Sequence, residues 1–171
     1  MVPAVLIAAC ISVHGDDGRE KKLAAARKRA EDAKGETKGG LTQMMNLVVV
    51  HYSDGMLLKG ETGNFFPNKN LFHLQERDSA EMRQINMQDL KAVYFVKSLD
   101  GKPGYTEKDD VERAGFGRKI RVHFKDGEVQ YGYTQGYAPN RPGFLIFPCD
   151  PDSNNERIFV VTGATEEVHF I

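Results

Sequence analysis

The sequence has few of the features that would assign it to a well-marked class of protein. It has two cysteines, Cys10 and Cys149, no tryptophan, and 23 Lys and Arg residues against 24 Asp and Glu residues. Two cysteines cannot build a disulfide framework or a structural zinc site by themselves. A net charge of −1 argues against a protein held to nucleic acid or anionic lipid by bulk electrostatics alone. No apolar run reaches the roughly 20 residues of a membrane-spanning helix, so we expect no membrane span.

A length of 171 residues allows one ordinary domain or two very small ones. The composition changes near Gly39-Gly40, because residues 1–40 are rich in alanine and charge and hold 8 Lys and Arg against 6 Asp and Glu. Residues 20–34 are strong helix formers, but Leu23 is the one large apolar side chain among them. We therefore predict that residues 1–40 form a leader, either helical or disordered, that does not dock on a core.

The start of this leader raises the question of a lipid anchor. Ile7-Ala8-Ala9-Cys10 resembles the lipobox that precedes the lipidated cysteine of bacterial lipoproteins. Such a signal normally has a basic segment before an unbroken apolar run. Here no Lys or Arg precedes Cys10, and Pro3 interrupts the run. We expect a cytoplasmic protein, with lipid anchoring through Cys10 as the alternative if the start is misassigned.

The strongest pattern in the rest of the chain is an internal duplication. Residues 50–72 align with residues 122–144 without a gap, and residues 82–96 align with residues 157–171 after three inserted residues. The identical pairs include Val50/Val122, His51/His123, Asp54/Asp126, Gly55/Gly127, Gly60/Gly132, Thr62/Thr134, Pro67/Pro139, Asn68/Asn140 and Phe72/Phe144. We therefore predict two copies of one small unit, residues 41–97 and residues 118–171, joined by a polar linker of residues 98–117.

Each copy is predicted to contain five short strands. Residues 47–53 and 120–125 alternate in apolar side chains, and each is followed by Asp-Gly, which is typical of a two-residue hairpin turn. A second strand passes through Gly60 or Gly132, where a glycine indicates the sharp bend that a very small barrel needs. Further strands are expected at residues 71–76, 82–86 and 91–97, and at residues 144–147, 157–162 and 167–171. The predicted fold class is all-β, with two tandem five-stranded Sm-like or SH3-like small barrels.

Two resemblances extend this prediction. The first three strands of each copy, with the Asp-Gly turn, the glycine-bent strand and the Asn-bearing loop, resemble the first motif of Sm and Sm-like proteins. The Arg-Gly pair of that family's second motif is absent from residues 82–97 and 157–171. Residues 117–160 also resemble a bacterial domain of unknown function that occurs in stand-alone proteins and in signalling chains. That resemblance implies a cytoplasmic regulatory or adaptor role and brings no ligand and no catalytic residues.

The residues that could carry chemistry do not form a recognisable catalytic pattern. His51 and His123 lie on strands between apolar neighbours, where a surface or interdomain role is favoured over metal binding. Cys149 has no sequence neighbour that would lower its thiol pKa. Because no phosphate loop, nucleophile elbow or paired-carboxylate motif occurs, we expect no enzymatic activity, no cofactor and no metal site.

Two equivalent loops contain the candidate binding residues. Each loop offers an aromatic ring, an asparagine and a cation, which are suitable for stacking on and reading single-stranded RNA bases. The candidates are Phe65, Phe66, Asn68, Lys69, Tyr137, Asn140 and Arg141. Residues 100–171 carry 12 Asp and Glu against 9 Lys and Arg, which opposes phosphate, and Pro-Asn also serves simply as a turn.

These patterns predict an interaction or adaptor module that binds a protein partner, or itself, through exposed strand edges and loops. Single-stranded RNA binding through the two loops is one alternative. Cyclic-dinucleotide sensing is another, because Arg113 and Arg118 resemble the closely spaced arginines of PilZ barrels. Their spacing is one residue longer than in that family, and no Asp/Asn-x-Ser-x-x-Gly follows.

Overall fold

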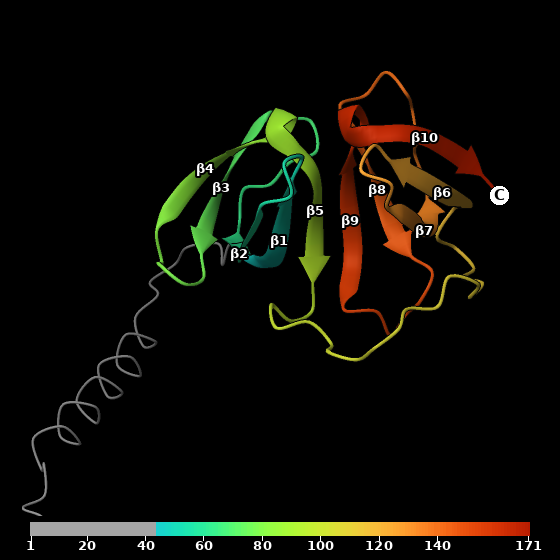
Figure 1. Cartoon of the computed structure of the whole chain (residues 1–171), viewed down its shortest axis with the longest axis horizontal. Coiled ribbons are helices and arrows are strands. Elements are labelled where there is room, and N and C mark those ends of the chain that lie inside the picture. The colour runs from blue at the N-terminus through green and yellow to red at the C-terminus, as the bar shows by residue number, and fades with distance from the viewer. Residues whose placement is uncertain (1–43) are drawn as a thin grey trace, which may run out of the picture. The chain divides into compact units, whose positions relative to one another are not determined.

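The computed structural model describes residues 44–171, so the predicted leader and the alternative of lipidation at Cys10 lie outside the described residues. Residues 44–171 form antiparallel strands and two single-turn 3-10 helices, with no α-helix (Figure 1). The prediction of an all-β fold is therefore confirmed. The elements are β1 (Asn46–Tyr52), β2 (Leu57–Thr62), β3 (Leu71–Glu76), β4 (Met82–Asn86), η1 (Met87–Asp89), β5 (Leu90–Val96), β6 (Arg118–Phe124), β7 (Val129–Thr134), β8 (Gly143–Pro148), β9 (Asn155–Val161), η2 (Thr162–Ala164) and β10 (Thr165–Phe170).

The two halves of this region, which we call repeat 1 (residues 46–96) and repeat 2 (residues 118–171), make corresponding hydrogen bonds. The Thr62 hydroxyl donates to the carbonyl of His73 over 2.7 Å, and the Thr134 hydroxyl donates to the carbonyl of Leu145 over 2.8 Å. Both hairpin turns contain a glycine at positive φ, +91° at Gly55 and +90° at Gly127. A β-carbon is disfavoured in that conformation, which explains why both turns use Asp-Gly.

The glycines inside the second strands are required by a close approach of backbones. A Cβ atom on Gly60 would lie 2.1 Å from the carbonyl oxygen of Gln75 on β3. A Cβ atom on Gly132 would lie 2.2 Å from Cγ2 of Ile146 and 2.6 Å from the carbonyl oxygen of Phe147. The second and third strands of each repeat pair over two residues only, so each sheet bends sharply there.

The expectation of two five-stranded barrels is corrected by the strand pairing. The described strands form one continuous sheet in the order β10-β6-β7-β8-β9-β5-β1-β2-β3-β4. In neither repeat does the fourth strand pair with the fifth to close a barrel, because β5 of repeat 1 pairs instead with β9 of repeat 2 (Figure 1). Every residue of β5 is buried, so this strand has no solvent-facing side.

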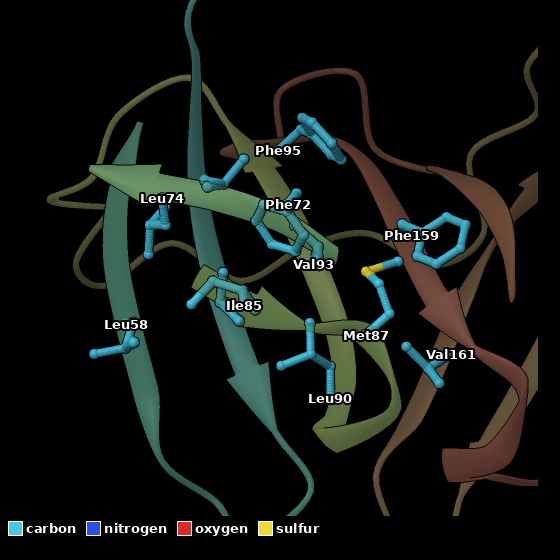
Figure 2. Packing of buried hydrophobic residues seen from close by; sticks show 12 residues of the cluster. Leu58, Phe72, Leu74, Ile85, Met87, Leu90, Val93, Phe95, Phe159 and Val161 are labelled. Carbon is cyan, nitrogen blue, oxygen red and sulfur yellow. The ribbon is translucent and has the colours of Figure 1, made fainter. Parts of the chain in front are cut away.

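The β5–β9 pair divides its two faces between two hydrophobic cores. Val93 and Phe95 of β5 join the core of repeat 1, together with Phe159 and Val161 of β9. Figure 2 shows the latter two side chains beside Met87 and the strands of repeat 1. The alternate residues of both strands belong to the core of repeat 2 and are Ala92, Tyr94, Val96, Ile158 and Val160. Each repeat therefore completes its core with side chains from the other.

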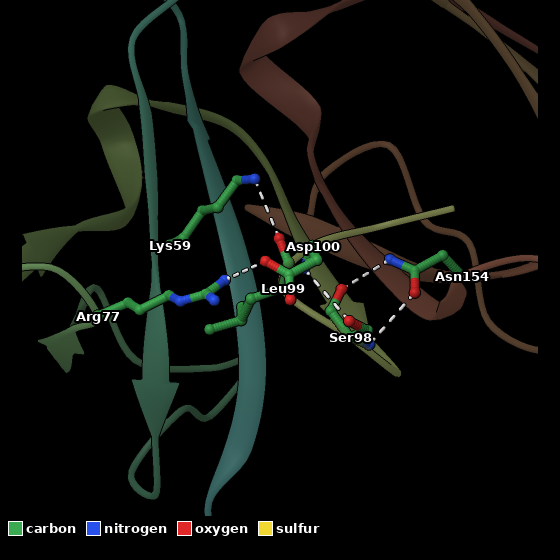
Figure 3. Close-up of polar contacts among 6 residues, drawn as sticks. All are labelled: Lys59, Arg77, Ser98, Leu99, Asp100 and Asn154. Carbon is green, nitrogen blue, oxygen red and sulfur yellow. Dashed lines mark hydrogen bonds and ion pairs between the residues drawn. The ribbon is translucent and has the colours of Figure 1, made fainter. Parts of the chain in front are cut away.

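The linker of residues 98–117 contains no helix or strand, but it is held by hydrogen bonds to both repeats. Ser98 and Asn154 bond each other through backbone and amide groups, and the Lys59 ammonium donates to the carbonyl of Leu99 over 3.0 Å (Figure 3). Arg77 forms an ion pair of 2.7 Å with Asp100. The linker therefore runs along the junction of the two repeats.

Candidate functional site

The most informative contact in the molecule is the one through which β9 is inserted beside repeat 1. The Arg157 guanidinium of β9 stacks 4.3 Å from the Phe95 ring and donates a 3.1 Å hydrogen bond to the side-chain oxygen of Asn46. The Phe159 ring lies 5.3 Å from the ring of Phe65. Arg157 and Phe159, which lie two positions apart on β9, thus fill a site built by β1, β5 and the loop after β2.

Repeat 2 has the corresponding site at β10, where it stands open. A pocket of about 630 Å³ lies there. It is lined by Gly115, Gly117, Arg118, Thr134, Gln135, Gly136, Tyr137 and Phe170. By the alignment of the repeats, Arg118, Tyr137 and Phe170 correspond to Asn46, Phe65 and Phe95. We call this the β10 site.

The β10 site combines aromatic surface, one cation and an unpaired strand. Tyr137 lies 5.9 Å from the Phe170 ring, and the Arg118 guanidinium lies 3.9 Å from the same ring. Among the described residues, β10 has one hydrogen-bonded neighbour, β6, so the other side of its backbone is available. Such an arrangement can accept an extended chain through backbone hydrogen bonds and hold alternate side chains in the pocket.

A cluster of charges spans the junction of the repeats near the hairpin turn of repeat 2. The Lys91 ammonium is buried and contacts the carboxylates of Asp126, at 2.5 Å, and Glu128. Burial lowers the pKa of Lys91, but its hydrogen bonds to the two carboxylates outweigh burial and raise that pKa overall. The Lys91 hydrogen bond in turn lowers the pKa of Asp126. Lys91 and Asp126 therefore favour their charged forms and make an ion pair across the junction of the repeats.

The aromatic residues of the two predicted binding loops are partly committed to internal packing. The Phe65 ring contacts those of Phe72, Phe95 and Phe159 at 5.1 to 5.3 Å. The Tyr137 ring lies 4.8 Å from that of Phe144. Both are half-buried and edge the two cores.

The remaining loop candidates are more exposed. Phe66 carries the Lys69 ammonium at 4.8 Å from its ring, and Asn68, Asn140 and Arg141 are exposed. The structure brings the two loops to one groove of about 330 Å³, whose lining includes Pro67 and Arg141. The loops therefore meet at the junction of the repeats, which the sequence did not predict.

Of the histidines and the cysteine that the sequence singled out, His51 and Cys149 take part in internal packing, and the Nε2 atom of His123 is buried without a hydrogen-bond partner. The His51 ring stacks on Tyr94 at 4.3 Å, and burial lowers its pKa. Burial raises the pKa of the Cys149 thiol at the end of β8. Among residues 44–171, no group of three or more His, Cys, Asp or Glu side chains is placed to hold a metal ion.

The two arginines considered for a cyclic dinucleotide, Arg113 of the linker and Arg118 of repeat 2, both make contacts within the chain. Arg113 stacks on Phe116 at 3.6 Å and donates a 2.8 Å hydrogen bond to the carbonyl of Pro148. Arg118 belongs to the β10 site. Sequence analysis therefore identified Arg118 and Tyr137 as candidate residues but did not identify Phe170. The alignment of residues 82–96 with residues 157–171 could have identified it, because that alignment pairs Phe170 with the buried Phe95.

In the described part of the chain, no helix is long and apolar enough to cross a membrane. The fold and the site define a class: an all-β protein of two similar five-stranded units that share a sheet and leave an aromatic-lined strand edge open. Residues 44–171 match the model of a family of unknown function, DUF6982, and the chain belongs to that family. Neither the comparison with curated proteins nor that with solved structures found a match.

Proposed function

We propose that this protein is a non-enzymatic interaction module that binds an extended polypeptide segment at the β10 site by adding a strand to the sheet. The observation that carries the proposal is the β9 segment itself. At the equivalent site of repeat 1, Arg157 and Phe159 already occupy the pocket while β9 pairs with β5. The same surface at β10 has a pocket and a strand edge with no paired strand and no counterpart of Phe159 among the described residues, while Arg118 of the site itself stacks on the Phe170 ring.

The physical chemistry of the site favours a peptide over a small polar ligand. Backbone hydrogen bonds along β10 supply affinity for any extended chain, and the Tyr137 and Phe170 rings select an apolar or planar side chain. The Arg118 guanidinium adds a donor beside the rings. We further propose that the two repeats are Sm-like and that the protein acts as a cytoplasmic adaptor in a bacterial signalling system.

The test uses the β9 segment, which pairs with β5 within the chain. A synthetic peptide of residues 153–162 is titrated into the isotope-labelled full-length chain, and binding is followed by nuclear magnetic resonance. We expect the largest shift changes at Arg118, Val168 and Phe170. Phe170→Glu should weaken binding by at least about tenfold, which corresponds to roughly 1.4 kcal/mol.

The matched control protein is Phe66→Glu, which places the same charge on an exposed ring outside the β10 site. It should bind the peptide as the wild type does. The matched control peptide carries Phe159→Asp and should bind weakly. Shift changes confined to residues away from β10, or equal binding by the Phe170→Glu protein, would overturn the proposal.

A further inference from the structure

We infer that the segment received at the β10 site is β4 of a second copy of this chain, so that molecules associate head to tail. The inference rests on the proposed function and names its partner. Its basis is that the sheet of the described residues ends at β10 on one side and at β4 on the other. These are the counterparts of β5 and β9, the two strands that pair within the chain.

The repeat alignment sets the register of the contact. Within the chain, Phe95 of β5 pairs with Arg157 of β9, and Val93 pairs with Phe159. Residues 82–96 align with residues 157–171, so Phe170 takes the place of Phe95 and Met82 that of Arg157. Between two molecules, Phe170 of one would therefore lie opposite Met82 of the next.

Both of these side chains are apolar and exposed at the ends of the sheet. Met82 exposes 62% of its surface and Phe170 38%. A thioether packs favourably against aromatic rings, and the β10 site offers both Tyr137 and Phe170. These two exposed apolar side chains would lie opposite each other in the register that β5 and β9 use within the chain. We therefore choose a second copy of this chain as the partner over an unrelated protein.

The geometry also fixes the type of assembly. The interface is heterologous, because it joins two different edges, and every molecule carries one edge of each kind. Such a contact leaves a free edge on each end of a dimer, so association continues until a ring closes or a filament grows. A two-fold dimer is not what this contact produces.

Two features of the internal junction are not reproduced and make the association weak: the Phe159 ring, whose counterpart on β4 is Gln84, and the ion cluster of Lys91. Lys91, which contacts Asp126 and Glu128 within the chain, has Glu166 as its counterpart in repeat 2. The counterparts of the two carboxylates in repeat 1 are Asp54 and Met56. The contact between molecules therefore places Glu166 near Asp54 and lacks the ion cluster.

This difference supplies a gain-of-function test. The double variant Met56→Glu/Glu166→Lys rebuilds the cluster of one lysine and two carboxylates at the contact between molecules. Sedimentation velocity from 1 to 500 µM should show the wild-type mass rising with concentration. The double variant should reach the same average mass at a concentration about tenfold lower, and high salt should reduce that gain.

Two single variants test the head-to-tail arrangement directly. Met82→Glu blocks the β4 edge and Phe170→Glu blocks the β10 edge, so each variant alone should be monomeric. Mixing them should give a one-to-one heterodimer, because each still has the edge that the other lacks. Phe66→Glu should associate as the wild type does.

The inference is overturned if the wild type stays monomeric throughout the range, if the double variant associates no better than the wild type, or if the mixture gives no heterodimer. Binding of the peptide of residues 153–162 by a protein that remains monomeric would overturn the choice of partner and leave the proposed strand addition standing. If the protein also fails to bind the peptide, both the head-to-tail association and the proposed strand addition are overturned.

Discussion

Phe65, in the loop after β2, and Phe159, on β9, place their rings edge to face with centroids 5.3 Å apart. They belong to different repeats, so the core of repeat 1 is completed by a side chain of repeat 2. Within the chain, β9 of repeat 2 thus covers the free edge of β5 of repeat 1. At β10 the corresponding edge has no such cover among residues 44–171.

Replacing Phe159 with alanine should destabilise both repeats together. The side chain is fully buried in the core of repeat 1, and truncating a buried phenylalanine typically costs about 3–5 kcal/mol. Chemical denaturation followed by circular dichroism should show one cooperative transition at a lower midpoint. Phe66→Ala, at an exposed ring in the loop after β2, should change the free energy of unfolding by less than about 0.5 kcal/mol. A second, unchanged transition in Phe159→Ala would show that the repeats unfold independently.

Lys91→Met should weaken the junction of the repeats. It removes the buried ammonium that contacts Asp126 and Glu128 and leaves these two half-exposed carboxylates close together. Because both carboxylates can regain water, we expect a loss on the order of 1–3 kcal/mol in the free energy of unfolding. Lys125→Met removes an exposed lysine that donates to the carbonyl of Gly163 and serves as the control. Equal stability of the two variants would contradict this account of the junction.

Gly132→Ala should be strongly destabilising for a change of one methyl group. The added Cβ would lie 2.2 Å from Cγ2 of Ile146 and 2.6 Å from the carbonyl oxygen of Phe147, so β7 and β8 would have to separate. Overpacking of this kind typically costs about 1–3 kcal/mol. Gly136→Ala adds the same methyl group with no atom within 4 Å and should be close to neutral, as measured by thermal denaturation.

The linker should make stability depend on acid through Asp150. A 2.5 Å hydrogen bond from the Tyr105 hydroxyl lowers the pKa of Asp150, with help from the backbone N–H groups of Lys108 and Asp152. A carboxylate with a lowered pKa stabilises the folded state fully above the unfolded-state pKa of about 3.9, and this contribution is lost as the pH falls through the folded-state value.

The measurement compares the wild type with Asp150→Asn and Tyr105→Phe in urea between pH 7 and pH 3. Both variants should be less stable than the wild type at pH 7, and the difference should shrink as the pH falls below about 4. A difference that is the same at pH 7 and pH 3 would show that the carboxylate charge does not contribute.

Much of each repeat could be predicted from the sequence because its signals are local. The strands Leu71–Glu76 and Met82–Asn86 begin and end where their apolar alternation predicts. The Asp-Gly turns and the glycine-bent strands also form as predicted, since each depends on residues a few positions apart. The closed barrels do not form, because β5 pairs with β1 of its own repeat on one side and with β9, rather than β4, on the other.

The candidate site, like the fold, could be predicted from the sequence only in part. The sequence directed attention to Tyr137 and Arg118 through residue type, but it could not show that they meet Phe170 beside an unpaired strand. It determined by itself the hairpins, the bends and the existence of two alike units, because turn sterics and side-chain alternation are encoded over a few residues. The tertiary structure alone decided which edges were joined and which stayed open. Backbone hydrogen bonds are the same for every strand, so the choice between edges falls to long-range packing and to the charges that meet across it.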